Sequence, residues 1–198
     1  TSINFPYHDN PGDFDASDYR LFGMPGNSDM YLDQIFGGGH EEQWIAYCDD
    51  YDFGNSRNVF VRYTPDDGRF RCYQGQGFWV INKGQLDVNM DISSAWLNDN
   101  YQAPIGLHNG WNIITNPFPF PVSWDVVRQL NGLGSLPLYA YDRGFYSTDA
   151  LQPYQGYYMD NYSNKSEILI PYNSSTAKIT AADEMNWKIG ITLESKNY

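Results

Sequence analysis

The chain has 198 residues, of which 41% are hydrophobic and 17% aromatic, and its formal net charge is −12. This composition favours a folded chain with a packed core. The scarcity of Lys and Arg argues against binding to nucleic acid or to anionic membranes, because phosphate recognition needs clustered basic side chains. No apolar run approaches the length of a membrane span, so membrane insertion is not expected either.

Residues 1–18 are an acidic lead-in, without the basic start and apolar run of a signal peptide. Carboxylates at close spacing either bind a hard cation such as Ca2+ or form a solvated turn. Ca2+ is the one cofactor that the sequence suggests. An EF-hand is excluded, because its glycine and terminal glutamate are missing. The candidate ligands are Asp9, Asp13, Asp15 and Asp18.

Residues 19–90 predict a series of strands with one short helix. A strand is expected at Tyr19–Met24, followed by a helix around Asp29–Phe36 that Gly37-Gly38-Gly39 terminates. A strand at Trp44–Tyr47 then leads into the acidic loop Asp49–Asn55, which is a second candidate for calcium binding.

A hairpin is predicted next. Val59–Tyr63 and Arg69–Tyr73 flank Pro65-Asp66-Asp67-Gly68, and this turn sequence favours a tight reversal. Strands at Gln76–Ile81 and Leu86–Met90 complete the series, the second by its alternation of apolar and polar residues.

Residues 110–172 predict a second series, after a connector at 91–109 that carries Trp96 and Tyr101. Its first strand must end near Asn116, because the alternating prolines that follow have no N–H for a sheet ladder. Ser123 is placed to cap a short helix that Asn131-Gly132 ends. The apolar side of this helix carries Val126, Val127 and Leu130. Further strands are expected at Leu138–Tyr141, Phe145–Tyr146, Gln155–Met159 and Ile168–Pro171.

The two series look like copies of one pattern. Tyr19–Asp33 aligns with Trp111–Asp125 without a gap, Gln76–Val80 corresponds to Gln155–Met159, and Val59–Tyr63 is matched with Leu138–Tyr141. Residues 37–58 then read as an insertion in the first copy. We expect an all-β fold: a pseudo-symmetric β-sandwich of two related repeats, 19–90 and 110–172, each with one short helix. Its core is expected to contain Trp111, Ile113, Ile114, Phe78 and Tyr139.

The tail, residues 173–198, contains a regularly alternating strand at Trp187–Glu194. This strand suggests a fragment whose next domain is missing. It either pairs within its own chain, giving a monomer, or adds to a neighbouring copy by strand donation, giving a fibre. The two cysteines, Cys48 and Cys72, either form a disulfide, as secretion would allow, or are buried thiols.

Several of these motifs resemble a duplicated module of large proteins that bacteria export by the type IX secretion route. The resemblance covers most of Tyr19–Leu193. It implies an extracellular or cell-surface location, a β-sandwich fold, and a further β domain that opens with the closing strand. It assigns no catalytic residues and leaves the ligand open. The motifs that carry it are Tyr19-Arg20-Leu21, Gly110-Trp111-Asn112, Asn116-Pro117-Phe118, Leu151–Tyr158 and Trp187-Lys188-Ile189.

No catalytic motif is recognisable. His8, His40 and His108 lack metal-ligand spacing, and neither a Gly-x-Ser-x-Gly elbow nor a phosphate-binding glycine loop is present. We therefore expect a protein that is not an enzyme.

The aromatic content suggests recognition of a polymer, because Trp and Tyr faces stack on sugar rings. The leading hypothesis is a non-catalytic extracellular module that binds a glycan or another surface polymer. Its expected partner is a polysaccharide or another cell-surface polymer. The alternative is a structural or adhesion module of a surface protein or fibre, with no small-molecule ligand. The candidate ligand-binding residues are the loop aromatics Trp44, Tyr51, Trp96, Tyr101 and Tyr154.

Overall fold

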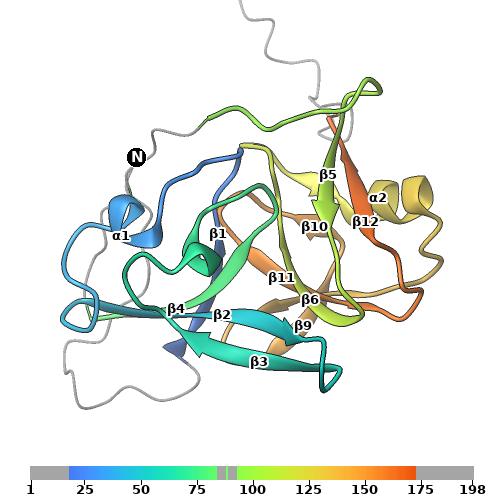
Figure 1. Cartoon of the computed structure of the whole chain (residues 1–198). Coiled ribbons are helices and arrows are strands. Elements are labelled where there is room, and N and C mark those ends of the chain that lie inside the picture. The colour runs from blue at the N-terminus through green and yellow to red at the C-terminus, as the bar shows by residue number, and fades with distance from the viewer. Residues whose placement is uncertain (1–17, 84–87, 89–92, 173–198) are drawn as a thin grey trace, which may run out of the picture.

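The computed structural model describes residues 18–83, 88 and 93–172. The first half contains β1 (Arg20–Gly23), α1 (Leu32–Ile35), β2 (Trp44–Asp52), β3 (Arg57–Arg62), the 3-10 helix η2 (Gly68–Phe70) and β4 (Gly77–Asn82). The second half contains β5 (Gln102–Gly106), β6 (Gly110–Thr115), β7 (Val122–Ser123), α2 (Trp124–Asn131), β8 (Leu138–Tyr141), β9 (Phe145–Thr148), β10 (Ala150–Leu151), β11 (Gly156–Asn161) and β12 (Glu167–Pro171). Strands dominate and the helices are short (Figure 1), which confirms the predicted all-β class. No helix among these residues has the length and apolarity that crossing a bilayer requires.

Two four-stranded antiparallel sheets form the framework. The first has the strand order β1-β4-β2-β3 and the second has the order β6-β11-β8-β9. In both sheets, the strand that comes first in the chain lies at one edge, next to the strand that comes last, and the second and third strands follow. The register agrees as well: Trp79 of β4 lies opposite Tyr47 of β2, and Tyr158 of β11 lies opposite Tyr139 of β8. Two-stranded sheets, β5–β12 and β7–β10, complete the second half.

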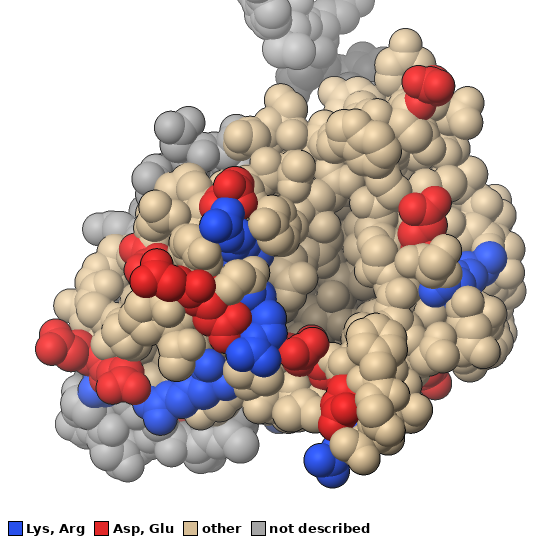
Figure 2. Space-filling view, in the orientation of Figure 1, with Lys and Arg blue, Asp and Glu red and all other residues tan. Residues whose placement is uncertain are grey.

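Several Arg side chains on the surface form ion pairs with Asp or Glu. Figure 2 shows acidic and basic groups side by side on one face of the molecule, gathered mainly over the first half. Arg69 contacts the carboxylates of Asp50 and Asp67, and Arg71 contacts that of Asp29. These exposed pairs contribute little to stability individually. They show that the acidic surplus is not concentrated in one patch on this face.

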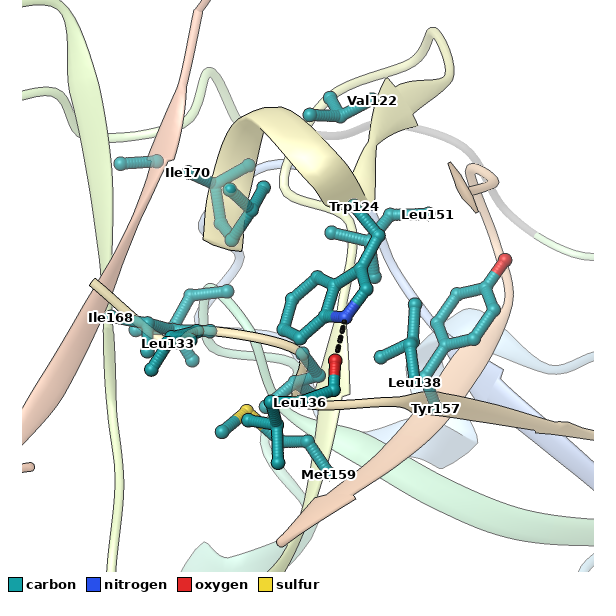
Figure 3. Packing of buried hydrophobic residues seen from close by; sticks show 14 of the residues in the cluster. Val122, Trp124, Leu133, Leu136, Leu138, Leu151, Tyr157, Met159, Ile168 and Ile170 are labelled. Atoms are coloured by element: carbon teal, nitrogen blue, oxygen red, sulfur yellow. Dashed lines mark hydrogen bonds between the residues drawn. The ribbon is translucent and has the colours of Figure 1, made fainter. Parts of the chain in front are cut away.

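Each large sheet covers its outer face with its own apolar core. In the first sheet, Phe78 and Val80 of β4 point outward and are buried against α1, while Trp79 between them points inward. In the second sheet, Tyr157 and Met159 of β11 are buried on the outer side, and Tyr158 points inward. Figure 3 shows part of the second core, where the indole N–H of Trp124 donates to the Leu136 carbonyl at 2.8 Å.

The inner faces of the two sheets approach closely at a corner built from glycines. A Cβ added to Gly23 of β1 would lie 2.0 Å from Thr115 Cγ2, and one added to Gly77 of β4 would lie 2.3 Å from Ile113 Cγ2. Phe22 forms a β-bridge with Gln155, just before Gly156 of β11. Only glycine allows backbones to approach in this way. The corner therefore fixes how the two sheets meet in a β-sandwich-like arrangement.

Two predictions for the first half are wrong. The predicted loop Asp49–Asn55 is largely part of β2, which forms its hairpin with β3 around a turn capped by the Asp52 carboxylate. The hairpin predicted at Pro65–Gly68 does not form. Asp67 instead accepts from the Arg69 N–H at 3.0 Å and caps η2, which places Phe70 in the core.

The same residues change how the halves correspond. Residues 37–58, predicted as an insertion, supply β2, an inner strand of the first sheet. The sequence matched Leu138–Tyr141 with Val59–Tyr63. In the structure, β8 (Leu138–Tyr141) holds the same position in its sheet as β2 holds in the first sheet, so it corresponds to β2 instead. The connector at 91–109 contributes β5, which pairs with β12.

The helix predicted after Ser123 is present as α2 and ends at Gly132, whose positive φ of 62° forms the expected left-handed cap. Ser123 occupies the N-cap, but its side chain makes no capping hydrogen bond. Trp124 and Val127 form the buried side of this helix, whereas Leu130 is exposed. The strand predicted at Trp187–Glu194 lies outside the described residues, as does Leu86–Met90 except for Val88.

Candidate functional site

An aromatic cage lies between the inner faces of the two sheets. Its volume is about 500 Å3, which is within the range of small-molecule sites. Strands β2, β3 and β4 of the first sheet and β6, β8, β9 and β11 of the second contribute to it. The lining residues are Asp49, Asn58, Phe60, Trp79, Trp111, Tyr139, Phe145 and Tyr158.

The position of the cage follows from the glycine corner. Trp79 and Tyr158 lie two residues beyond Gly77 and Gly156 along their strands, so side chains fill the space where the backbones have separated. Each is the last residue of a Gly-aromatic-aromatic motif, Gly77-Phe78-Trp79 in β4 and Gly156-Tyr157-Tyr158 in β11. In each motif the first aromatic residue enters its own core and the second faces the other sheet.

The rings form walls around a floor. Tyr158, almost fully buried, has its ring centroid 6.2 Å from that of Trp111 and 5.6 Å from that of Phe145, at interplanar angles of 77° and 74°. Trp79 lies 6.0 Å from the Tyr158 ring at 43°. Trp111 is 44% exposed and Phe145 is 57% exposed, so these two walls stand at the open side. The rings are therefore steeply inclined and not coplanar.

The polar atoms of the cage are connected in one hydrogen-bond network. The Trp79 indole N–H donates to the Tyr158 hydroxyl at 3.0 Å, and this hydroxyl donates to Asp49 Oδ2 at 3.0 Å. Asn58 Nδ2 donates to Asp49 Oδ1 at 2.9 Å and to the Trp111 carbonyl at 2.7 Å. All these donors point to partners within the protein. A carboxylate has about four acceptor positions, so the network leaves some of those of Asp49 unused, although the surface that faces the hollow is almost entirely apolar.

Burial shifts the ionisation of both groups at the floor. Burial raises the pKa of the Asp49 carboxyl, and the hydrogen bonds from Asn58 and Tyr158 oppose this rise by stabilising the anion. Burial, and then the charge of Asp49, raise the pKa of the Tyr158 phenol well above its ordinary value. The raised pKa keeps the Tyr158 phenol protonated as a donor, and the geometry makes both Asp49 oxygens acceptors, one for Tyr158 and one for Asn58.

A second, more open hollow of about 400 Å3 adjoins the cage and shares Phe60 and Trp79 with it. Tyr19 and Tyr47 complete its lining. The Tyr19 ring lies 6.0 Å from that of Tyr47 and 6.4 Å from that of Trp79. The Tyr141 ring lies 4.8 Å from the Trp79 ring, centroid to centroid, in an edge-to-face contact.

The aromatic residues predicted from the sequence do not come together in this site. Trp44 was expected in an exposed loop, but it begins β2 and is only 1% exposed, since it packs against Phe36 and Tyr63 in the first core. Tyr51 stacks on the His108 ring at 4.5 Å. Tyr154 is partly buried against the first core.

Two predicted residues are exposed as expected, although away from the cage. Trp96 is 60% exposed and Tyr101 is 70% exposed, both in the segment between the halves. The backbone N–H of Trp96 donates to the Gln74 side chain at 2.8 Å, which ties this segment to the first half. Tyr101 has a positive φ of 58° and stands at the start of β5.

The calcium prediction falls mostly outside the described residues. Asp9, Asp13 and Asp15 are not described, and Asp18 is buried. Among the described residues, no group of three or more His, Cys, Asp or Glu side chains is arranged to hold a metal ion. In the second candidate loop, the Asp52 carboxylate is engaged by Gly54 and Asn55.

Cys48 and Cys72 are free thiols, both buried in the first core. Burial raises the pKa of Cys48 to about 12 and raises that of Cys72 as well. Of the two alternatives that the sequence left open, a disulfide or buried thiols, the structure has the buried thiols.

The sequence analysis missed the cage residues for a simple reason. It assigned Trp111 and Tyr139 to the core, and it did not consider Asp49 as a neighbour of Tyr158, 109 positions away. A usable signal was present: strand alternation after each glycine sends one aromatic residue of the pair away from its own core.

Comparisons with known proteins supply no further assignment. No protein-family model matches the chain, and no curated protein or solved structure shows significant similarity to it. The resemblance to the type IX module therefore stays a prediction.

Proposed function

We propose that this chain is a non-catalytic binding module that takes a compact ligand into the aromatic cage between its two sheets. One observation carries the proposal: the rings of Trp111 and Phe145 stand nearly perpendicular to that of Tyr158 around an open hollow of about 500 Å3. Large aromatic side chains left half exposed in a concave site are typical of ligand recognition.

The shape of the cage favours a compact group over a flat chain. A polysaccharide platform needs ring faces in one plane, so that successive sugars can stack on them. Here the faces enclose a space from several sides. The lining offers few polar contacts, those of Asp49 and Asn58 together with the Tyr158 hydroxyl, whereas a sugar needs many hydrogen bonds.

The test is a ligand screen monitored by tryptophan fluorescence and confirmed by calorimetry. Trp111→Ala and Phe145→Ala are expected to weaken any ligand found by at least about tenfold, as expected for truncated aromatic anchors. Tyr146→Ala is the matched control, because Tyr146 is the similarly exposed neighbour on the opposite face of β9. Equal effects of Phe145→Ala and Tyr146→Ala would contradict recognition in the cage.

Recognition of a glycan or another surface polymer is the second candidate. It is supported by the exposure of Trp96 and Tyr101, which no described core residue covers. Affinity electrophoresis in polysaccharide gels tests it: Trp96→Ala is expected to abolish retardation, and Trp111→Ala is expected to leave it unchanged. Retardation by no polysaccharide in the panel would remove this candidate.

We further propose that the module acts outside the cell and consists of two related repeats, as the resemblance to type IX exported proteins implies. The shared strand order of the two large sheets supports the repeat. So does the equivalence of Trp79 opposite Tyr47 with Tyr158 opposite Tyr139. Immunoblotting of fractionated cells of the source organism tests the location, and recovery of the protein only in the cytoplasm would refute it.

A further inference from the structure

The hydrogen-bond network at the floor of the cage uses all of its own donors. The Trp79 N–H and the Tyr158 O–H are both used inside the network, as is the Asn58 amide nitrogen. The Asp49 carboxylate keeps acceptor positions, and it is the group at the floor that carries charge. Apart from the Tyr139 hydroxyl and the Trp111 indole N–H, an anion or a ligand rich in acceptors would find no side-chain donor among the lining residues that is not already engaged.

The aromatic walls reinforce this preference. The face of an aromatic ring carries a partial negative charge, and Trp is the strongest of the rings in attracting a cation. Trp79, Trp111 and Phe145 surround the Tyr158 ring within 6.2 Å, centroid to centroid. Rings inclined to one another can contact a single centre together. The ring faces and the Asp49 carboxylate would thus both attract a cation.

The kind of cation follows from desolvation. A primary ammonium group has three N–H donors, each of which must find an acceptor when it leaves water. The acceptors among the lining residues are Asp49, the amide oxygen of Asn58 and the Tyr139 and Tyr158 hydroxyls, and almost none of the surface that faces the hollow is polar. A quaternary ammonium group has no N–H to satisfy, is weakly hydrated, and presents methyl groups that bury apolar surface against the rings.

From this geometry we propose that the cage binds a small quaternary ammonium compound, with its methyl groups against the rings of Trp79, Trp111, Phe145 and Tyr158 and its charge beside Asp49. The proposal rests on the proposed function, because it names the ligand class of the same site. The volume of about 500 Å3 suits a free small molecule that enters as a whole.

The test compares two probes of nearly the same shape. Choline carries the charge, and 3,3-dimethylbutan-1-ol replaces its nitrogen by carbon. Calorimetry at pH 7 and low salt is expected to show choline binding at least about tenfold more tightly than the alcohol. Equal affinities would overturn the cation proposal while leaving the binding function intact, and binding of neither probe would overturn the cation proposal.

Two charge variants distinguish a specific effect of the Asp49 charge from the effect of the overall negative charge of the protein. Asp49→Asn is expected to weaken choline binding by about tenfold or more and to leave the neutral alcohol unaffected. Asp50→Asn removes the same charge one residue away on the opposite face of β2, where Asp50 contacts Arg69. It is expected to change choline binding less than about twofold, because an exposed charge is screened. Equal losses in both variants would overturn a specific role for Asp49.

Two further arms identify the source of the ammonium group. A peptide containing trimethyl-lysine and vesicles of phosphatidylcholine present the same headgroup on larger carriers. We expect neither to bind more tightly than choline. Binding of either carrier without binding of free choline would overturn the proposal of a small soluble ligand. Thermal melting of each variant without ligand verifies that the fold is retained.

Discussion

The close approach of the sheets at the glycine corner can be tested by adding one methyl group. In Gly23→Ala, the new Cβ would lie 2.0 Å from Thr115 Cγ2 and 2.5 Å from its Cβ. Thr115 is fully buried, and as a β-branched residue it has few alternative rotamers. Overpacking of this kind costs about 1–3 kcal/mol. For a chain of this size, each kcal/mol lowers Tm by about 2–4 °C.

Urea and thermal unfolding give the measurement, and a second substitution identifies the cause. Thr115→Ser removes Cγ2, the atom nearest the new methyl group, at a cost of about 1 kcal/mol for the lost buried carbon. The double variant Gly23→Ala with Thr115→Ser is therefore expected to be more stable than the sum of the single effects predicts, by about 1 kcal/mol. Gly106→Ala is the control, because a Cβ there meets no atom within 4 Å. A Gly23→Ala variant as stable as the wild type, with no coupling to Thr115, would refute the close contact of the sheets.

Four other results are expected. Burial raises the folded-state pKa of Asp49, and hydrogen bonds from Asn58 and Tyr158 and the charges of His108 and Asp50 also act on the carboxyl. This group therefore contributes stability that is complete below the unfolded-state pKa and is lost as pH rises through the folded-state pKa. Relative to Asp49→Asn, the wild type should gain stability in urea titrations as pH falls toward 4. An unchanged difference between the two proteins would contradict it. Native Cys48 and Cys72 should resist DTNB at pH 8 and react after unfolding, because only the thiolate is nucleophilic; rapid labelling of the native protein would show that the thiols are accessible. If Asp9, Asp13, Asp15 and Asp18 bind Ca2+, EDTA should lower Tm and Ca2+ should restore it, whereas a constant Tm would leave a solvated turn. Light scattering should give a monomer at all concentrations, and a concentration-dependent mass that disappears on deletion of residues 186–198 would indicate strand donation.

The fold class could be predicted from local signals, since turn residues and strand alternation are properties of short segments. Gly132 ends α2 as the sequence indicates, and the glycine before Phe78 and that before Tyr157 both begin strands. The hairpin was misplaced for a local reason too. Pro65–Gly68 has turn chemistry that suits a capped 3-10 helix as well as a hairpin, and the burial of Phe70 decides between them.

The site could not be predicted in the same way, because it depends on contacts between sheets. Trp79 and Tyr158 are 79 positions apart in the chain, and their hydrogen bond exists only after both sheets have formed and met. Trp111 was expected in the core because tryptophan is usually buried, but the inner face of its sheet opens at this point. Trp44 shows the opposite error: it was predicted to begin a strand, but its place in the supposed insertion at residues 37–58 made this core residue look accessible.

Across the two sheets, the residues two positions beyond Tyr47 and Tyr139 make reciprocal contacts. Asp49 of β2 bonds to Tyr158 of the second sheet, and Tyr141 of β8 packs on Trp79 of the first. Of these two equivalent positions, one is charged and the other aromatic. The charge of the cage thus depends on a single residue, while its shape depends on strands from both sheets. One substitution at position 49 would therefore change the charge of the cage without replacing any of the aromatic side chains that shape it.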